Sequence, residues 1–97
     1  MTSLTASRST KPYKSTPVFD EVIISAGLRR EHRTKAGTCG VIRVLDGRLR
    51  YQVLEPNSEA ILEPGRPGLI LPEQPHLVEP LGLVRMQVEF YDHVPEL

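Results

Sequence analysis

Hydrophobic residues in this chain occur in short runs that proline and glycine separate. Residues 48–53 alternate between polar and apolar side chains, and residues 83–91 repeat the same spacing. An alternation with a period of two predicts a strand with one buried face and one solvent-facing side. The apolar members of the two runs are Leu49, Tyr51, Val53, Val84, Met86, Val88 and Phe90.

Dipeptides and tripeptides typical of turns lie between these runs. Asp46-Gly47 predicts a two-residue hairpin turn, because both central positions of a type I′ turn require positive φ. Val41, Ile42, Val44 and Leu45 alternate less regularly, which predicts a strand buried on both sides. Further short strands are predicted at 60–62, 69–71 and 76–79, with a connection at 64–68 and a turn at 80–82.

Seven or eight short strands at this spacing predict an all-β fold, an antiparallel sandwich or barrel. The prolines and glycines leave no room for a long helix. Only Asp20 to Ser25 resembles a helical turn, and its β-branched residues argue against one. Residues 1–12 are rich in Ser and Thr and are expected to form a disordered tail. A single domain is expected over 13–93, with 94–97 as the C-terminal end.

Composition narrows the classes of function. The formal net charge is zero, and no basic stripe is present, so we expect no nucleic-acid partner. The single cysteine, Cys39, excludes an intrachain disulfide framework. No apolar run long enough for a membrane helix and no secretory signal is seen, which predicts a cytoplasmic protein without a membrane partner. The apolar strand faces exceed what one small core can hide, which predicts a homodimer.

Three residues are candidates for a metal site. His32 and His76 are expected to face the interior, and Glu79 follows His76 by three positions. Two imidazoles and a carboxylate with open coordination positions suit Fe(II), Zn(II) or Mn(II). Glu79 would lie opposite His76 on an ideal strand, so a bulge beside Pro80 is needed to bring them together. The alternative is that both histidines are partly buried polar residues that backbone groups satisfy.

Other side chains could also contribute to a site, and most of them have two possible interpretations. Glu89 is a rival carboxylate, which faces either the barrel interior or solvent. Cys39 is either a reactive thiol or a small semi-buried residue, and no activating group lies beside it except Lys35. His93 is expected to be exposed. The basic cluster of Arg29, Arg30, Arg33 and Lys35 is either a solvated face or an attractor of oxyanions at a pocket mouth.

The chain contains the blocks TPVFDE, AGLRREHRTKAGTCGVIRVLDGRLRYQVLE, PGRPGLILPEQPHLVEPLG and VEFY. Together these blocks resemble the TehB/YeaR-like small cupin family, which occurs alone and fused ahead of the methyltransferase domain of some tellurite-resistance proteins. The resemblance covers about Tyr13 to Tyr91. It implies a cupin fold, a double-stranded β-helix or jelly roll.

The resemblance also places residues in the site. The family blocks EH-x-T-K-x-G and P-x-x-x-H-x-V-E fall on residues 31–37 and 72–79. Thr34 stands where many cupins have a second histidine of the first motif, and Gly40 falls near their usual glutamate. The family blocks include His32, His76 and Glu79, and Glu79 would replace one of the usual ligands, so the expected site is a divalent metal on these three residues. Thr34, which lies in a family block, and Tyr51 and Glu89, taken from the strand pattern, are expected as possible pocket residues.

These observations support three hypotheses about function. The first is a metal-binding cupin with a small anionic ligand that acts in tellurite or oxyanion stress. The second is a metal-dependent oxygenase or isomerase with the same ligands. The third is a metal-free binding or interaction module, in which the histidines are too far apart to share an ion.

Overall fold

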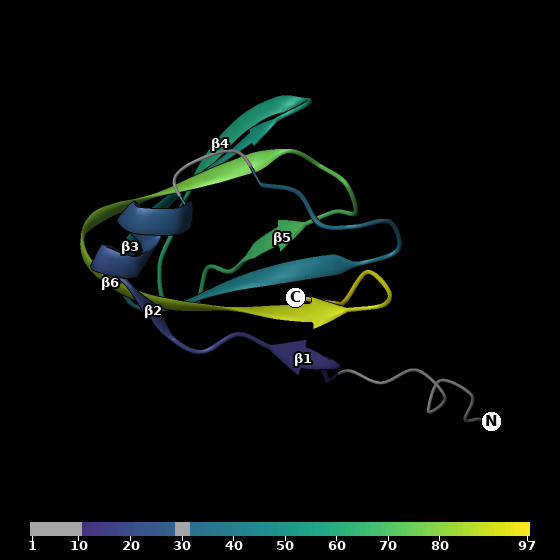
Figure 1. Cartoon of the computed structure of the whole chain (residues 1–97), viewed down its shortest axis with the longest axis horizontal. Helices are drawn as coiled ribbons and strands as arrows, with labels where there is room; N and C mark the ends of the chain where they lie inside the picture. Colours follow the sequence, from purple (N-terminus) through teal and green to yellow (C-terminus); the bar gives the residue numbers. More distant parts are fainter. Residues whose placement is uncertain (1–10, 29–31) are drawn as a thin grey trace.

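Two long strands dominate the computed structural model, which describes residues 11–28 and 32–97. They are β3 (Cys39–Leu54) and β6 (His76–Tyr91), and they pair antiparallel along their whole length. In Figure 1, β6 runs along the top in green, bends at the left and returns along the bottom in yellow. The paired strands form two arms on either side of this bend. One arm contains residues 39–44 and 86–91, and the other contains residues 49–53 and 76–80. Each long strand therefore contributes to both arms.

Short strands extend the sheet on both sides of this pair. β1 (Lys14–Ser15) and β2 (Phe19–Asp20) pair with the second half of β6. β4 (Asn57–Leu62) and β5 (Gly68–Ile70) pair with β3. The described residues thus form one antiparallel sheet of six strands, which confirms the all-β fold class with fewer strands than the sequence predicts.

The predicted hairpin at Asp46-Gly47 is wrong, because β3 continues through it. Asp46 and Gly47 lie in a bend with register shifts on either side, and they face Arg85 and Val84 of β6. Gly47 has φ of +81°, and a Cβ atom there would lie 2.0 Å from the carbonyl oxygen of Leu83. Glycine is therefore required at a corner where two backbones touch, rather than at a turn that reverses the chain.

The predicted turn at 80–82 is wrong for the same reason. Gly82 has φ of +96°, but β6 passes through it without a break. The hairpin that follows β3 instead lies at Glu55-Pro56, a cis peptide bond between β3 and β4. The sequence signal located two positions that need glycine, and it assigned them to the wrong kind of feature.

A helical segment occurs where the β-branched residues argued against one. α1 (Glu21–Ile23) is followed by a π-helical stretch, η2 (Ile24–Leu28). The Asp20 carboxylate accepts hydrogen bonds from the amides of Val22 and Ile23, at 3.1 and 3.0 Å, and so caps the helix. Ile24 is fully buried in the core. Capping and burial outweigh the propensity of the β-branched side chains.

The main core lies inside the bend of the two long strands. The alternation over 48–53 is confirmed, because its apolar members are buried and its polar members are not. Val41 and Ile42 are both buried although they are neighbours, which confirms burial on two sides for that part of β3, but Leu45 is 49% exposed. The core residues are Ile24, Ile42, Val44, Leu49, Tyr51, Val53, Leu62, Ile70, Val78, Val84 and Met86.

The expected disordered tail falls, for residues 1–10, outside the described residues. Arg29 and Arg30 of the basic cluster also fall outside them. None of the helices in the described part of the chain is long and apolar enough to cross a membrane.

Candidate functional site

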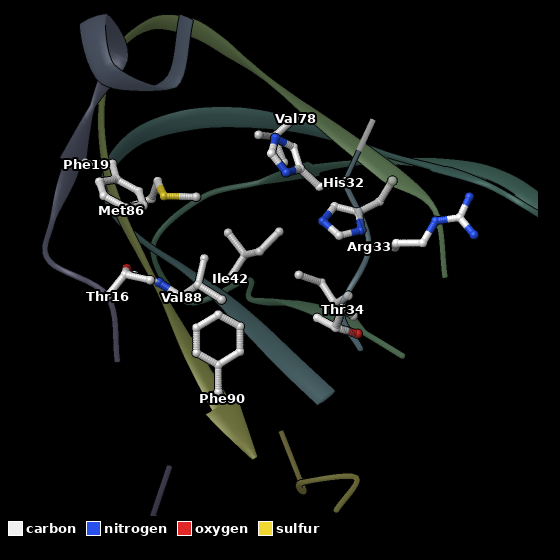
Figure 2. A pocket seen from close by; sticks show the side chains of 12 residues that line it. Thr16, Phe19, His32, Arg33, Thr34, Ile42, Val78, Met86, Val88 and Phe90 are labelled. Atoms are coloured by element: carbon white, nitrogen blue, oxygen red, sulfur yellow. Dashed lines mark hydrogen bonds between the residues drawn. The ribbon is translucent and has the colours of Figure 1, made fainter. Parts of the chain in front are cut away.

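A cavity of about 300 Å³ lies between the two arms of the fold. Most of its wall is apolar, and the apolar face of the second half of β6 supplies a large part of it. Figure 2 shows the side chains around it, with the Arg33 guanidinium pointing away from the apolar groups. The lining residues are Thr16, Phe19, His32, Arg33, Thr34, Ile42, Ile70, His76, Val78, Met86, Val88 and Phe90.

The backbone brings His32 and His76 together at this cavity. The two residues form an isolated antiparallel bridge, in which each amide donates to the other's carbonyl at 2.7 and 2.8 Å. Residues directly opposite in an antiparallel ladder project to the same face. Their ring centroids are 6.4 Å apart with a tilt of 35°. The expectation that both histidines face the interior is therefore met in the geometry.

His76 is held in one tautomer. Its Nδ1 lies 3.1 Å from the carbonyl oxygen of Gln74, and a carbonyl only accepts, so Nδ1 carries the proton. The side chain is buried, and burial lowers its pKa; the Gln74 bond opposes this shift and the nearby His32 adds to it. The ring also meets the Tyr51 ring edge-on at 5.9 Å. A neutral imidazole with an unprotonated Nε2 results, the form that binds metals or accepts a hydrogen bond.

Glu79 lies apart from the two histidines. It pairs with Arg50 across β6 and β3, and its Oε1 lies 3.4 Å from the Arg50 Nη1. It does not line the cavity. An ideal strand would place Glu79 on the face opposite His76, and the structure has this arrangement, since His76 and Val78 point inward and Glu79 does not. Within residues 11–28 and 32–97, no group of three or more His, Cys, Asp or Glu side chains is arranged to hold a metal ion.

The distance between the His32 and His76 rings is close to the distance between two imidazoles that bind the same ion. With a metal–nitrogen distance near 2.0 Å, each ring centroid lies about 3.2 Å from the ion, so tetrahedral ligands have centroids about 5 Å apart. The observed 6.4 Å exceeds this by about 1 Å. To share one ion, His32 and His76 would have to approach each other by about this amount, and Glu79 would have to leave Arg50.

The three expected pocket residues have different positions. Thr34 lines the cavity, and its hydroxyl lies 3.4 Å from the carbonyl oxygen of Leu71. Tyr51 is buried behind His76, where its hydroxyl donates to the Leu69 carbonyl at 2.9 Å and burial raises its pKa to about 12. Glu89 lies on the opposite face of the sheet. It accepts hydrogen bonds from the Arg43 Nε and the Tyr91 hydroxyl, both at 2.9 Å.

Two further candidates do not belong to the cavity. Cys39 is 2% exposed, and burial raises the pKa of its thiol, which favours the inert reading over the reactive one. His93 packs on Tyr91, with ring centroids 5.7 Å apart, and its Nδ1 lies 2.8 Å from Asp92. Only 12% of its side chain is exposed, so the expectation of a solvent-facing histidine is wrong.

Sequence reasoning missed much of the apolar wall. The parity of Met86, Val88 and Phe90 identified a buried face, but nothing in the pattern indicated that this face borders an open space. Phe19 and Thr16 enter the wall from β2 and the residues before it. Their placement follows from the pairing of Phe19 with Met86, a long-range contact that no local signal encodes.

A known crystal structure shares this architecture. The crystal structure of TehB from Haemophilus influenzae matches with a TM-score of 0.71 and 28% identity, over 81% of this chain and 30% of that one. This chain therefore spans about a third of that protein. A search of curated proteins found no match.

Two other crystal structures share the fold at lower identity. A protein from E. coli strain K12 matches with a TM-score of 0.73 and 22% identity, over 88% of this chain and 91% of that one. The Fe(II) form of HppE matches with a TM-score of 0.59 and 16% identity, over 76% of this chain and 40% of that one. Finally, the profile of the TehB-like domain matches residues 14–88. The chain therefore belongs to the TehB-like domain family.

Proposed function

We propose that this chain is a small cupin that binds a divalent metal ion in its cavity through His32 and His76. The observation that carries the proposal is the backbone bridge between these two residues, which directs both imidazoles to one cavity. The neutral His76, with its Nδ1 bonded to Gln74, supports the same role. A metal there would act as a Lewis acid for an oxygen-bearing ligand.

Glu79 is the proposed third ligand, and its use requires that it leave Arg50 and turn toward the cavity, away from which it now points. If Glu79 stays with Arg50, water or the bound ligand completes the coordination. The physiological setting that the TehB/YeaR-like resemblance implies is resistance to tellurite or a similar oxyanion. We propose that the protein works in the cytoplasm as a homodimer.

Metal content of the protein, purified without a tag, tests the proposal. We expect about one equivalent of Zn(II), Mn(II) or Co(II) per chain after stripping with EDTA and titration, measured by elemental analysis and by the visible spectrum of Co(II). His32→Ala and His76→Ala should each weaken binding at least about tenfold, the usual effect of losing a ligand. His93→Ala is the matched control, because His93 lies outside the cavity wall.

Glu79→Gln decides the third ligand. A loss equal to that of the histidine variants would place Glu79 on the metal, and an unchanged affinity would assign that position to water or ligand. Substoichiometric metal that His76→Ala does not alter would overturn the metal proposal. The protein would then be a metal-free binding module, which the apolar wall of the cavity favours as the second candidate.

A further inference from the structure

A second hollow of different chemistry adjoins the cavity. This outer depression has a volume of about 370 Å³. It shares Arg33, Thr34 and Phe90 with the cavity wall, so the two spaces meet at these side chains. The residues that line the outer depression are Tyr13, Lys14, Arg33, Thr34, Lys35, Thr38 and Phe90.

The outer depression is basic. Lys14 comes from β1, and Arg33 and Lys35 come from the segment that precedes β3, so the tertiary fold gathers three cations. No aspartate or glutamate is among its lining residues. Over the described ranges, 11–28 and 32–97, neither Lys14 nor Lys35 has an ion pair. Clustered like charges at a concave site attract an ion of opposite sign.

The cavity, unlike the outer depression, favours apolar groups over anions. Ile42, Met86 and Val88 offer no hydrogen bonds, so a bare inorganic oxyanion in this part of the cavity, away from the histidines, would lose hydration without replacement. An apolar group there would instead be favoured by its removal from water. At about 30 Å³ for each water-sized group, the cavity has room for about ten such groups.

We propose that the two hollows together bind an amphipathic organic anion. Its apolar body, of about eight to ten carbon-sized groups, occupies the cavity, and its anionic head lies in the outer depression beside Lys14 and Lys35. The head is a carboxylate or a phosphate ester, which share the chemistry that these cations recognise. The inference deepens the proposed ligand-binding function of the same site, but it does not depend on the metal.

Binding of four probes to the metal-free protein in EDTA tests this inference. Octanoate and octyl phosphate carry both features, 1-octanol lacks the charge, and inorganic phosphate lacks the apolar body. Calorimetry below the micelle concentration should show that at least one of the two amphiphilic anions binds about tenfold or more tightly than octanol and inorganic phosphate. The comparison between octanoate and octyl phosphate identifies the head group. Equal affinity for octanol and for both anions would overturn the proposal.

Variants locate the two parts of the ligand. The double variant Lys14→Gln/Lys35→Gln should weaken anion binding about tenfold and leave octanol binding unchanged. Arg48→Gln/Arg66→Gln is the matched control, since it removes two exposed charges outside the outer depression. An equal effect of the two double variants would show that only general charge attraction acts, and the proposed head site would be refuted.

Methyl NMR spectra locate the apolar body without any substitution in the cavity. The amphiphilic anion that binds more tightly should shift the methyl signals of Ile42, Ile70 and Met86, which line the cavity, and leave Leu97 at the C-terminus unchanged. Shifts confined to other methyl groups would refute the proposed position. Because all these measurements exclude metal, their failure leaves the metal proposal standing, and failure of the metal titration leaves this inference standing.

Discussion

The corner at Gly47 allows a sharp test of how the two long strands form the fold. In Gly47→Ala the added Cβ would meet the Leu83 carbonyl oxygen at 2.0 Å, and the Cα of Val84 at 3.0 Å. Both are backbone atoms of the paired strand β6, so no side-chain rotation relieves the overlap. The strands must move apart at the bend, where β3 and β6 turn between the arms of the fold.

Gly65 provides the matched control for this substitution. Its φ of +89° is close to the +81° of Gly47, but a Cβ there meets nothing within 4 Å. Gly65→Ala therefore measures only the left-handed backbone, which destabilises a non-glycine residue by about 1–2 kcal/mol. Reduced freedom of the unfolded chain offsets part of this, by about 0.4–1 kcal/mol. The expected loss in Gly65→Ala is about 1 kcal/mol.

Gly47→Ala adds the overlap to the same backbone effect. Overpacking typically destabilises by about 1–3 kcal/mol, so the total expected loss is about 2–4 kcal/mol. A domain of this size has a free energy of unfolding of about 5–15 kcal/mol, and the variant should still fold. Urea unfolding followed by circular dichroism gives both values. If Gly47→Ala lost no more stability than Gly65→Ala, the contact between the strands would not restrict position 47.

Three further predictions concern buried side chains. Burial lowers the pKa of His76 in the folded protein. As the pH falls below about 6.5, the His76 imidazole therefore becomes protonated in the unfolded state before it does in the folded state. The free energy of unfolding, measured in EDTA, should decline below that pH and be constant above it. His76→Gln should flatten this decline in urea unfolding at a series of pH values, and an unchanged slope would contradict the assignment. Tyr51→Phe should lower the free energy of unfolding by about 1 kcal/mol, since the Leu69 carbonyl loses its donor, whereas Tyr13→Phe, at a tyrosine 58% exposed, should have no effect. The Cys39 thiol should react with a disulfide reagent at least about a hundredfold more slowly in the native protein than in urea, and a comparable rate in both would show that it is accessible.

The sequence predicted the alternating faces well, because burial on a strand depends on a local period of two. The apolar members of residues 48–53 are buried as the pattern indicates, and so are Val84 and Met86, whereas Val88 and Phe90 are half-buried. Turns were predicted less well. Asp46-Gly47 and Pro80-Leu81-Gly82 signal a need for positive φ, and local sequence does not distinguish a chain reversal from a corner in a continuous strand.

The candidate site was predictable in part. His32 and His76 were chosen as residue types, and the bridge that joins them depends on pairing between segments 44 residues apart in number, which no local pattern records. Glu79 was chosen for its spacing, although strand parity already argued against it. The helix at Glu21–Ile23 was also missed by local reasoning. The Asp20 cap and the burial of Ile24 stabilise it although the intrinsic propensity of its β-branched residues is unfavourable.

The continuity of β3 and β6 through both arms has a consequence for ligand detection. The strands that line the cavity are also the strands that hold the whole sheet, so an opening of either arm disrupts part of the cavity wall. A ligand bound between them would raise the free energy of every opening that exposes either arm. Amide hydrogens at Val53 and at Val88, in opposite arms, should therefore slow their exchange together when the cavity is filled, and the melting temperature should report occupancy of a site too small for most optical probes.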